Sequence, residues 1–477
     1  MVSLKTIKRL FCSRILSSLL VISLFAVAAN SVLFADQTQV ISQIQDLDDE
    51  FKSLSSEFYA NALSTANADL TRVKDIDQLL DWVKGFVANQ QPIAAIRLIN
   101  FNTATIRNNI DSQAVFTLTD ILLAHNEWRL AKSIFDEIED EGDNSLLALM
   151  RYIFAKYHAR RNEWTEVNRL LNGIFSELSP DNAAHAYLLN GSALQYMKKH
   201  RLAVESHSKI PPESEYYSYA RLNMAIANIR QGWLTEARTT LRGLIAESRQ
   251  QGESDLTYRL YLVLGYALLQ REYYRDARES FRNIALDSRY ANRALLGIGL
   301  TATSQGDFVG GLNALTILKE KQTFDLPVDE SYLLIPYLYE KLQQGTTATA
   351  SYNEAIAYYQ SRLIQLNNLL NLRPEFNRVK YIDDTSSLII RNTSLNYGEM
   401  FPVSFIHNYR ELNGFSTFNQ NPAMAKKIEG LVFKFNRVFQ SILVELIERR
   451  KNYLSSYLSQ SQYGLARLYD SSREQTN

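Results

Sequence analysis

The chain has 477 residues with 51 basic and 51 acidic side chains, so it lacks the positive charge expected of a nucleic-acid-binding protein. Its single cysteine, Cys12, excludes a disulfide framework and any metal site built on several thiolates. The length exceeds what one hydrophobic core usually organises, which predicts several domains or a repeat array, and the low counts of proline (9) and glycine (18) favour helices.

Residues 1–35 are predicted to form a secretory signal peptide. A basic head without acidic residues precedes an apolar run over 15–29, and Val27 and Ala29 provide the small residues that a signal peptidase reads. The alternative is an uncleaved N-terminal anchor, because the run from Ile15 to Phe34 could just span a bilayer. Either way we expect an exported protein, periplasmic or anchored in the inner membrane and facing the periplasm.

Residues 36–79 are predicted to contain an N-terminal capping helix. Apolar side chains recur there at steps of three and four, as on one face of an amphipathic helix: Ile41, Ile44, Leu47, Phe51, Leu54 and Phe58. We expect this helix to cover the first repeat, and a helix that binds a partner is the alternative.

Residues 80–360 contain an internal repeat. A small residue is followed four positions later by a bulky one, most clearly in Ala131/Phe135, Ala237/Leu241 and Ala277/Phe281. The small residues of the series fall at positions 95, 131, 167, 203, 237, 277, 311 and 355. A second small residue stands twelve positions before most of them, as at Gly265, and Gly232 and Gly306 mark tight turns. This pattern predicts stacked helical hairpins.

The most regular unit, with Tyr261, Leu264, Gly265, Ala277 and Phe281, resembles the tetratricopeptide repeat family. The resemblance implies an all-α fold, a right-handed superhelical solenoid of stacked helix-turn-helix repeats. In such an array small residues let the two helices of a hairpin approach, and bulky residues fill the gap to the next hairpin. No repeat buries its apolar face alone, so neighbours must stack.

Residues 361–477 are predicted to be a C-terminal helical region with a long irregular loop over 383–424. The loop is rich in Asn, Ser, Thr and Gly, with at most short strands around Ser387–Ile390. Helices are expected to about Asn371, from Ala425 to Lys451, and over Leu454–Tyr469. We interpret the region as a cap on the end of the solenoid, with a partner-binding module as the alternative.

Motifs for catalysis are missing from the sequence. It has no glycine-rich phosphate loop ending in Gly-Lys-Ser/Thr and no His-Glu-x-x-His. His200 and His207 flank a repeat turn, which favours packing over metal binding, and Ser192 falls inside a predicted helix and not on a strained turn. We therefore predict a protein that is not an enzyme, with no catalytic residues, no cofactor and no metal.

The first helices of the hairpins are expected to line a concave groove that binds a partner. Tyrosine offers a rigid ring with a polar tip, and arginine offers a forked donor for carboxylates. These residues suit an extended or helical segment that is acidic or ends in a free carboxylate; the alternative is that they only solvate the surface. The predicted groove residues are Tyr152, Lys156, Arg160, His185, Tyr196, Tyr219, Arg230, Arg259, Tyr266, Gln270 and Arg293.

Together these features predict a non-enzymatic scaffold or adaptor of the cell envelope. Its expected partners are other envelope proteins, with no nucleic acid, and with membrane contact only through the N-terminal segment if that segment is not cleaved. The alternatives are a glycan- or peptidoglycan-binding protein that uses the abundant Tyr and Trp, and an enzyme with its site in residues 361–477.

Overall fold

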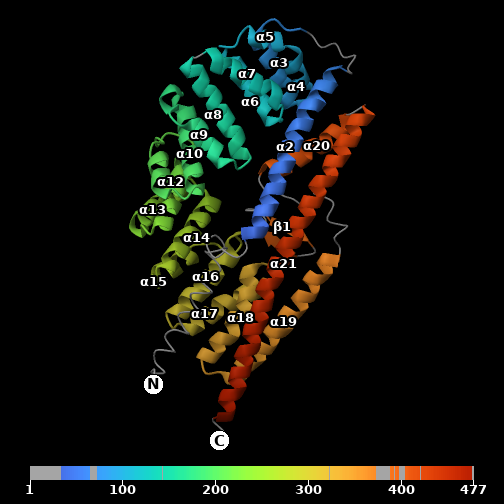
Figure 1. Cartoon of the computed structure of the whole chain (residues 1–477). Coiled ribbons are helices and arrows are strands. Elements are labelled where there is room, and N and C mark those ends of the chain that lie inside the picture. The colour runs from blue at the N-terminus through green and yellow to red at the C-terminus, as the bar shows by residue number, and fades with distance from the viewer. Residues whose placement is uncertain are drawn as a thin grey trace. The chain divides into compact units, whose positions relative to one another are not determined.

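The computed structural model describes residues 34–64, 72–141, 143–321, 323–371, 387–390, 393–396, 403–418 and 421–474 (Figure 1). The predicted signal segment lies outside these residues except for Phe34 and Ala35, which begin the first described helix. Among the helices described, none combines the length and the apolar character needed to cross a bilayer. The chain divides into two compact units, a first unit with residues 43–240 and 398–439 and a second unit with residues 241–397 and 440–477.

The first unit is built from helical hairpins and a flanking group of helices. The hairpins are α3 (Ile76–Ala88) with α4 (Pro92–Phe101), α6 (Gln113–Ala124) with α7 (Trp128–Glu141), α8 (Asn144–Arg160) with α9 (Trp164–Leu171), α10 (Pro180–Tyr196) with α11 (His200–His207), and α12 (Tyr217–Gln231) with α13 (Leu234–Gln250), whose end belongs to the second unit. The short helix α5 (Thr103–Arg107) joins the first two pairs. The flanking helices are α2 (Phe34–Ser64), α20 (Val403–Phe418) and the start of α21 (Pro422–Glu474).

The second unit continues the same construction. Its hairpins are α14 (Ser254–Gln270) with α15 (Tyr274–Arg282), α16 (Ala291–Ser304) with α17 (Phe308–Lys319), and α18 (Leu326–Lys341) with α19 (Gly345–Asn371). Two short antiparallel strands, β1 (Ser387–Ile390) and β2 (Thr393–Asn396), follow, and α21 supplies its residues from 440 onward. In each unit the second helix of one hairpin packs on the first helix of the next. The prediction of an all-α array of stacked helical hairpins is confirmed.

A left-handed residue in the turn of every hairpin sets the repeat. The hairpin-turn positions, with φ between 58° and 84°, are Gln90, Asn126, Asn162, Lys198, Gly232, Glu272, Gly306 and Gln343. Their spacings are 36, 36, 36, 34, 40, 34 and 37 residues. In the first seven hairpins the predicted small-residue position follows the left-handed residue by five, as Ala131 follows Asn126 and Ala277 follows Glu272. The predicted register is therefore confirmed through position 311.

The eighth hairpin corrects the predicted pair Ala355/Tyr359. Five residues after Gln343 comes Ala348, which is fully buried, and Tyr352 follows four positions later. Ala355 and Tyr359 are also buried, but they lie two turns further along α19 because that helix is 27 residues long and carries its apolar stripe well past the hairpin contact. The pattern alone could not separate the two pairs, since both consist of alanine followed by tyrosine.

We expect replacement of Glu272 by glycine to stabilise the protein by about 0.5–1 kcal/mol, because a side chain at φ 62° is strained and glycine is not, while glycine gives back some entropy on unfolding. The matched change Gly232→Ala, at φ 84°, should destabilise by about 1 kcal/mol. Thermal unfolding of both variants measures the difference. A shift in the same direction for both would contradict the strain argument.

The packing of small residues against bulky residues is as predicted. A Cβ atom added to Gly265 would lie 2.5 Å from the ring of Phe281, and one added to Gly299 would lie 2.6 Å from Leu315. His207, which stands where an aromatic was expected, covers Gly191 in the same way, at 2.4 Å. These glycines are therefore required by the close approach of the two helices, and His207 serves as a packing ring.

The second half of α21 completes the last hairpin of the second unit (Figure 1). Tyr457 donates to Glu330 and Arg467 donates to Glu340, and each pair is separated by 127 residues, so α21 runs parallel to α18. A Cβ on Gly464 would lie 2.5 Å from the ring of Tyr352, as a Cβ on Gly297 would lie 2.5 Å from Phe281. This part of α21 thus occupies the position that the first helix of a further repeat would take.

A buried charged cluster joins α18, α19 and α21. Asp329 is fully buried and accepts from the hydroxyl of Tyr358 at 2.6 Å, and the guanidinium of Arg450 lies against its carboxylate. The adjacent Glu330 accepts from Tyr457 at 2.9 Å, and its burial raises its pKa to about 7. Arg362 completes the cluster from α19, with its guanidinium 3.8 Å from the ring centre of Phe324. The carboxylates of one hairpin are therefore neutralised by a helix that comes much later in the chain.

The raised pKa of Glu330 predicts a pH-dependent stability. The folded pKa of about 7 exceeds the ordinary 4.5, so the folded state holds a proton that the unfolded state has lost between these values, and stability falls as pH rises through this window. Glu330→Gln keeps an acceptor for Tyr457 and cannot ionise. We expect this variant to be more stable than the native chain near pH 8, by up to about 3 kcal/mol, and to match it near pH 4. Thermal unfolding across pH measures this, and a less stable variant at the alkaline end would contradict it.

In the first unit, α2, α20 and the start of α21 form a flanking bundle. The rings of Phe51 and Phe58 stack on Phe415 at 5.9 and 4.1 Å, and Phe435 of α21 meets Phe51 edge-on. The bundle lies on the turns of the second and third hairpins. There Ser56 donates to Glu127 at 2.9 Å, and the buried Asp48 of α2 forms an ion pair with Arg161 at 3.8 Å. Within the bundle, Asp48 also accepts from Asn408 of α20 at 2.8 Å.

The C-terminal region differs from the predicted elements. The prediction of an irregular loop is wrong over Val403–Phe418, where α20 forms because Phe405, Leu412 and Phe415 bury one face of it. The two helices predicted after Ala425 are one continuous helix, since no proline or glycine interrupts the chain between Lys451 and Leu454. The short strand expected at Ser387–Ile390 is present and pairs with β2.

Candidate functional site

The predicted groove residues lie on the first helices of the hairpins, and they divide between the two units. The first unit holds Tyr152, Lys156, Arg160, His185, Tyr196, Tyr219 and Arg230, and the second unit holds Arg259, Tyr266, Gln270 and Arg293. The exposed members and the buried members have different surroundings. Their role in binding stays a prediction.

Three exposed residues of the first unit form a stripe, which we call the turn-end stripe. Arg160, Tyr196 and Arg230 each stand two residues before a left-handed turn residue, so they occupy the same place at the ends of α8, α10 and α12. These helices pack on one another in sequence. All three side chains are exposed, Tyr196 to 64%, and neither arginine has a carboxylate partner among the residues described. The stripe offers two unpaired guanidinium groups with an aromatic ring between them.

The location of Arg160 and Arg230 at helix C-termini stabilises their charges without a carboxylate partner. A cation in the last turn of a helix faces the negative end of the helix dipole, which stabilises it. Arg160 ends α8 and Arg230 lies in the last turn of α12. The guanidinium groups remain available to a carboxylate from another molecule, because the helix end lowers the energy of the charge without occupying its hydrogen-bond donors.

The side chains of Tyr152 and His185 lie against one another. Tyr152 is only 6% exposed, and its hydroxyl lies 2.8 Å from Nδ1 of His185, whose ring stacks on Tyr216. Burial, with the nearby Lys156, lowers the pKa of His185 to about 4, so its ring is neutral near pH 7 and can accept from the tyrosine. The expectation that Tyr152 is exposed is wrong, because the neighbouring hairpin covers its position.

The two remaining predicted groove residues of the first unit, Lys156 and Tyr219, differ in their contacts. Lys156 donates to Asp120 of α6 at 2.7 Å, so its charge is paired within the array. Tyr219 of α12 is 60% exposed and lies one repeat after His185, 34 residues along the chain. Of these two residues, only Tyr219 presents most of its side chain to solvent.

The predicted groove residues of the second unit also divide into buried and exposed side chains. Tyr266 is 9% exposed, its hydroxyl donates to the backbone carbonyl of Arg293 at 2.8 Å, and its ring packs on Phe281 at 4.9 Å. The expectation of an exposed Tyr266 is therefore also wrong, because it fills the contact between α14 and α16. Arg259, Gln270 and Arg293 are exposed, and neither arginine forms an ion pair with a described residue.

The sequence reasoning missed one aromatic residue at the turn end. Trp233 follows Gly232 directly, three residues after Arg230, and it is 44% exposed. The Gly-Trp pair is visible in the sequence, but it marks a turn in the repeat pattern, and the pattern alone does not identify Trp233 as a surface residue. Trp164 also reaches this end, with its ring centre 6.4 Å from that of Tyr196.

The histidines of the first unit do not form a metal site with other described residues. No group of three His, Cys, Asp or Glu side chains in the described part of the chain could hold a metal ion. His207 is buried against Gly191, and burial lowers its pKa to about 4, while burial and the nearby Arg230 lower the pKa of His200. The two histidines thus serve in the hairpin packing and beside the turn-end stripe.

Comparison with known proteins gives likenesses of structure. No protein-family model and no curated protein matches the sequence. The apo form of RapI is 13% identical, with 76% of this chain and 97% of that chain covered at a TM-score of 0.44. PilW, a type IV pilus biogenesis factor, is 17% identical over 46% of this chain and 99% of its own, at 0.34. A tetratricopeptide repeat protein from Parabacteroides merdae ATCC 43184 is 14% identical over 54% and 96%, at 0.35. Likenesses of this size say nothing of what this chain binds.

Proposed function

We propose that this protein is a non-enzymatic scaffold that holds a segment of another protein along the turn-end stripe of its first unit. The observation that carries the proposal is the stripe itself: Arg160, Tyr196 and Arg230 recur at one position of three stacked hairpins, exposed and without carboxylate partners in the described residues. A surface that repeats with the fold is suited to a ligand that also repeats, such as a polypeptide backbone with side chains at regular intervals.

The chemistry of the stripe favours an acidic segment with aromatic or apolar residues. Arginine binds carboxylates through two parallel hydrogen bonds, and tyrosine and tryptophan provide contact area at little entropic cost. Tyr196 and Trp233 supply that area at the same turn ends as Arg160 and Arg230, and Tyr219 is exposed at the other end of α12. A basic partner would meet unpaired guanidinium groups and would be repelled.

The proposed setting is the cell envelope, with other envelope proteins as partners. Support for export comes from the basic head and the apolar run of residues 1–35. A glycan-binding role through the exposed aromatic residues is the second candidate, since Tyr196 and Trp164 lie near one another at the turn end.

The proposal predicts that Arg160→Glu/Arg230→Glu weakens capture of acidic peptides by tenfold or more, roughly, because two attractive charges become repulsive. Peptides are selected on the native chain from a random-peptide display library, and their affinities are measured by fluorescence anisotropy. We expect the selected peptides to be enriched in Asp and Glu together with aromatic residues.

A matched control separates the stripe from overall charge. Arg169→Glu/Arg201→Glu makes the same change of charge on α9 and α11, the second helices of the first unit, where both arginines are exposed. This control should retain affinity. Equal loss in both variants, or selection of basic peptides, contradicts the assignment, and binding of peptidoglycan fragments in place of peptides supports the second candidate.

A further inference from the structure

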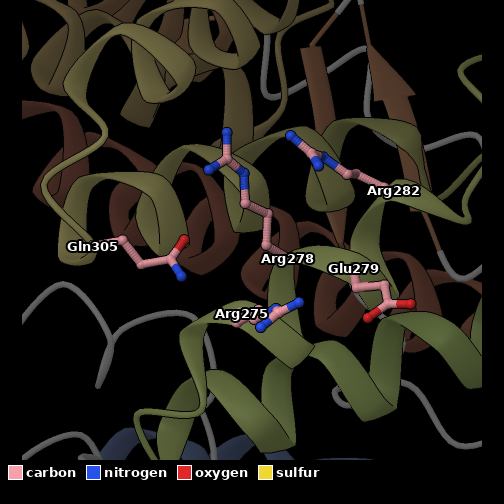
Figure 2. A pocket seen from close by; sticks show the side chains of 5 residues that line it. All are labelled: Arg275, Arg278, Glu279, Arg282 and Gln305. Carbon is pink, nitrogen blue, oxygen red and sulfur yellow. The ribbon is translucent and has the colours of Figure 1, made fainter.

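A hollow in the second unit is lined by positive charge. Its volume is about 300 Å³, and it lies between α15 and the turn that joins α16 to α17. The lining residues are Arg275, Arg278, Glu279, Arg282 and Gln305 (Figure 2). We call this hollow the arginine pocket. It belongs to a second helix and an adjoining turn, and it contains none of the predicted groove residues.

Helix geometry brings the three arginines together. Residues 275, 278 and 282 are three and four positions apart, so their side chains project from one face of α15. In Figure 2 the side chain of Arg282 reaches toward that of Arg278, and Gln305 projects into the space near Arg275, while the carboxylate of Glu279 points away. The pocket therefore gathers guanidinium groups and directs its own lining carboxylate elsewhere.

One arginine is fixed and two are unpaired. Arg278 forms an ion pair with Asp307 at 2.6 Å, and Asp307 is itself held by the backbone N–H of Gly310 at 2.9 Å. The Nε atom of Arg278 is buried and has no hydrogen-bond partner. Arg275 and Arg282 are exposed, with no ion pair to any residue in the described ranges. Three like charges face one hollow, and one of them is neutralised.

We propose that the arginine pocket binds a small free anion that carries a phosphate group. Guanidinium groups form charge-assisted, bidentate hydrogen bonds to phosphate oxygens. A phosphate has three terminal oxygens, enough to receive donors from Arg275, Arg278 and Arg282, whereas a carboxylate has two, and Asp307 already supplies one carboxylate to this group. The volume lies at the lower end of the range for small-molecule sites, which favours a free anion over a polymer.

Charge balance supports the occupant. The pocket and its neighbour Asp307 carry three positive and two negative side chains, and one of the negative side chains points away. A bound dianion would offset the repulsion among the arginines, which lie within a few turns of one helix. An apolar ligand would leave these guanidinium groups without acceptors, at a cost in free energy.

The test uses the full chain and inorganic phosphate as the probe. Isothermal titration calorimetry at low salt should show saturable binding of phosphate, with acetate at the same concentration binding at least about tenfold more weakly because it offers fewer oxygens and less charge. Arg275→Gln/Arg282→Gln should weaken phosphate binding at least about tenfold. The matched control Arg242→Gln/Arg271→Gln removes two exposed charges from the same unit and should bind as the native chain does.

Other arms of the experiment distinguish the sources of phosphate. A phosphoserine peptide and vesicles that contain phosphatidic acid are titrated in parallel, and binding of either without binding of free phosphate overturns the proposal. Absence of saturable binding, equal binding of acetate, or an unchanged affinity in the Arg275/Arg282 variant also overturns it. The Arg160→Glu/Arg230→Glu variant should bind phosphate as the native chain does. The phosphate proposal and the turn-end stripe proposal are therefore tested independently.

Discussion

Replacing Arg450 by methionine should destabilise the second unit by about 3–5 kcal/mol, because it leaves the fully buried carboxylate of Asp329 without its cation. The loss should appear as a lower unfolding temperature and as faster amide hydrogen exchange in α18 and in the second half of α21. Burial already raises the pKa of Asp329, and Arg450 is the main charge that opposes this rise. Without Arg450, the carboxylate must take up a proton or admit water.

The neighbouring residue provides the control. Arg449 lies on the same helix and pairs with Glu445 at 2.6 Å, and both side chains are partly exposed, at 25% and 19%, so Arg449→Met should cost clearly less than Arg450→Met. Asp329→Asn combined with Arg450→Met should recover part of the loss, since both charges of the pair are then gone. If Arg449→Met and Arg450→Met cost the same, the charged cluster does not hold α21 in place.

Replacing Phe281 by alanine should cost about 3–5 kcal/mol, because its ring is fully buried between two hairpins. The Cδ1–Cε1 edge of the ring is close to Gly265 of its own hairpin, and the Cδ2–Cε2 edge is close to Gly297 of the next. Gly297→Val should cost about 1–3 kcal/mol in the native background, since its Cβ would lie 2.5 Å from the ring.

A double-mutant cycle tests whether the two costs share a cause. In the Phe281→Ala background the valine gains space, so the combined loss should be smaller than the sum of the single losses. Tyr273→Ala removes a ring that is 54% exposed in the same unit and should change stability by less than about 0.5 kcal/mol. Additive losses would mean that Phe281 and Gly297 do not form a size-matched contact.

The array could be predicted from sequence because each repeat is a local event. Three positions define each hairpin: a left-handed turn residue, a small residue five positions later and a bulky residue four positions after that. Because all three lie within one hairpin, their spacing can be read directly from the sequence. The prediction was wrong at the eighth pair, Ala355/Tyr359, because α19 has two equally good alanine-tyrosine steps and only the position of Gln343 decides between them.

Contacts between distant segments could not be predicted in this way. Glu330 and Tyr457 are 127 residues apart, and nothing in the local pattern of either segment points to the other. The helix α20 was missed because its buried residues, such as Phe405 and Leu412, stand among asparagine, serine and glycine that are typical of loops. Its apolar face is buried against α2, which comes more than 300 residues earlier in the chain.

For the candidate site, residue type was predictable and exposure was not. Arg160, Tyr196 and Arg230 are exposed because they lie in the last turn of their helices, whereas Tyr152 and Tyr266 lie further from the helix ends, where the next hairpin covers them. A repeat pattern assigns a residue to a helix face, but whether that face is open depends on the size of the side chains on the following helix.

The position of α21 has a consequence for synthesis of the chain. The hairpin of α18 and α19 is complete by residue 371. Asp329, Glu330 and Tyr352 also need contacts from residues 450–467, which are synthesised later. A ribosome must therefore add most of the remaining polypeptide before this hairpin can bury its carboxylates. A chain truncated before that point would expose these carboxylates and the ring of Tyr352 at the end of the array. A protease that degrades incomplete proteins could recognise this exposed surface.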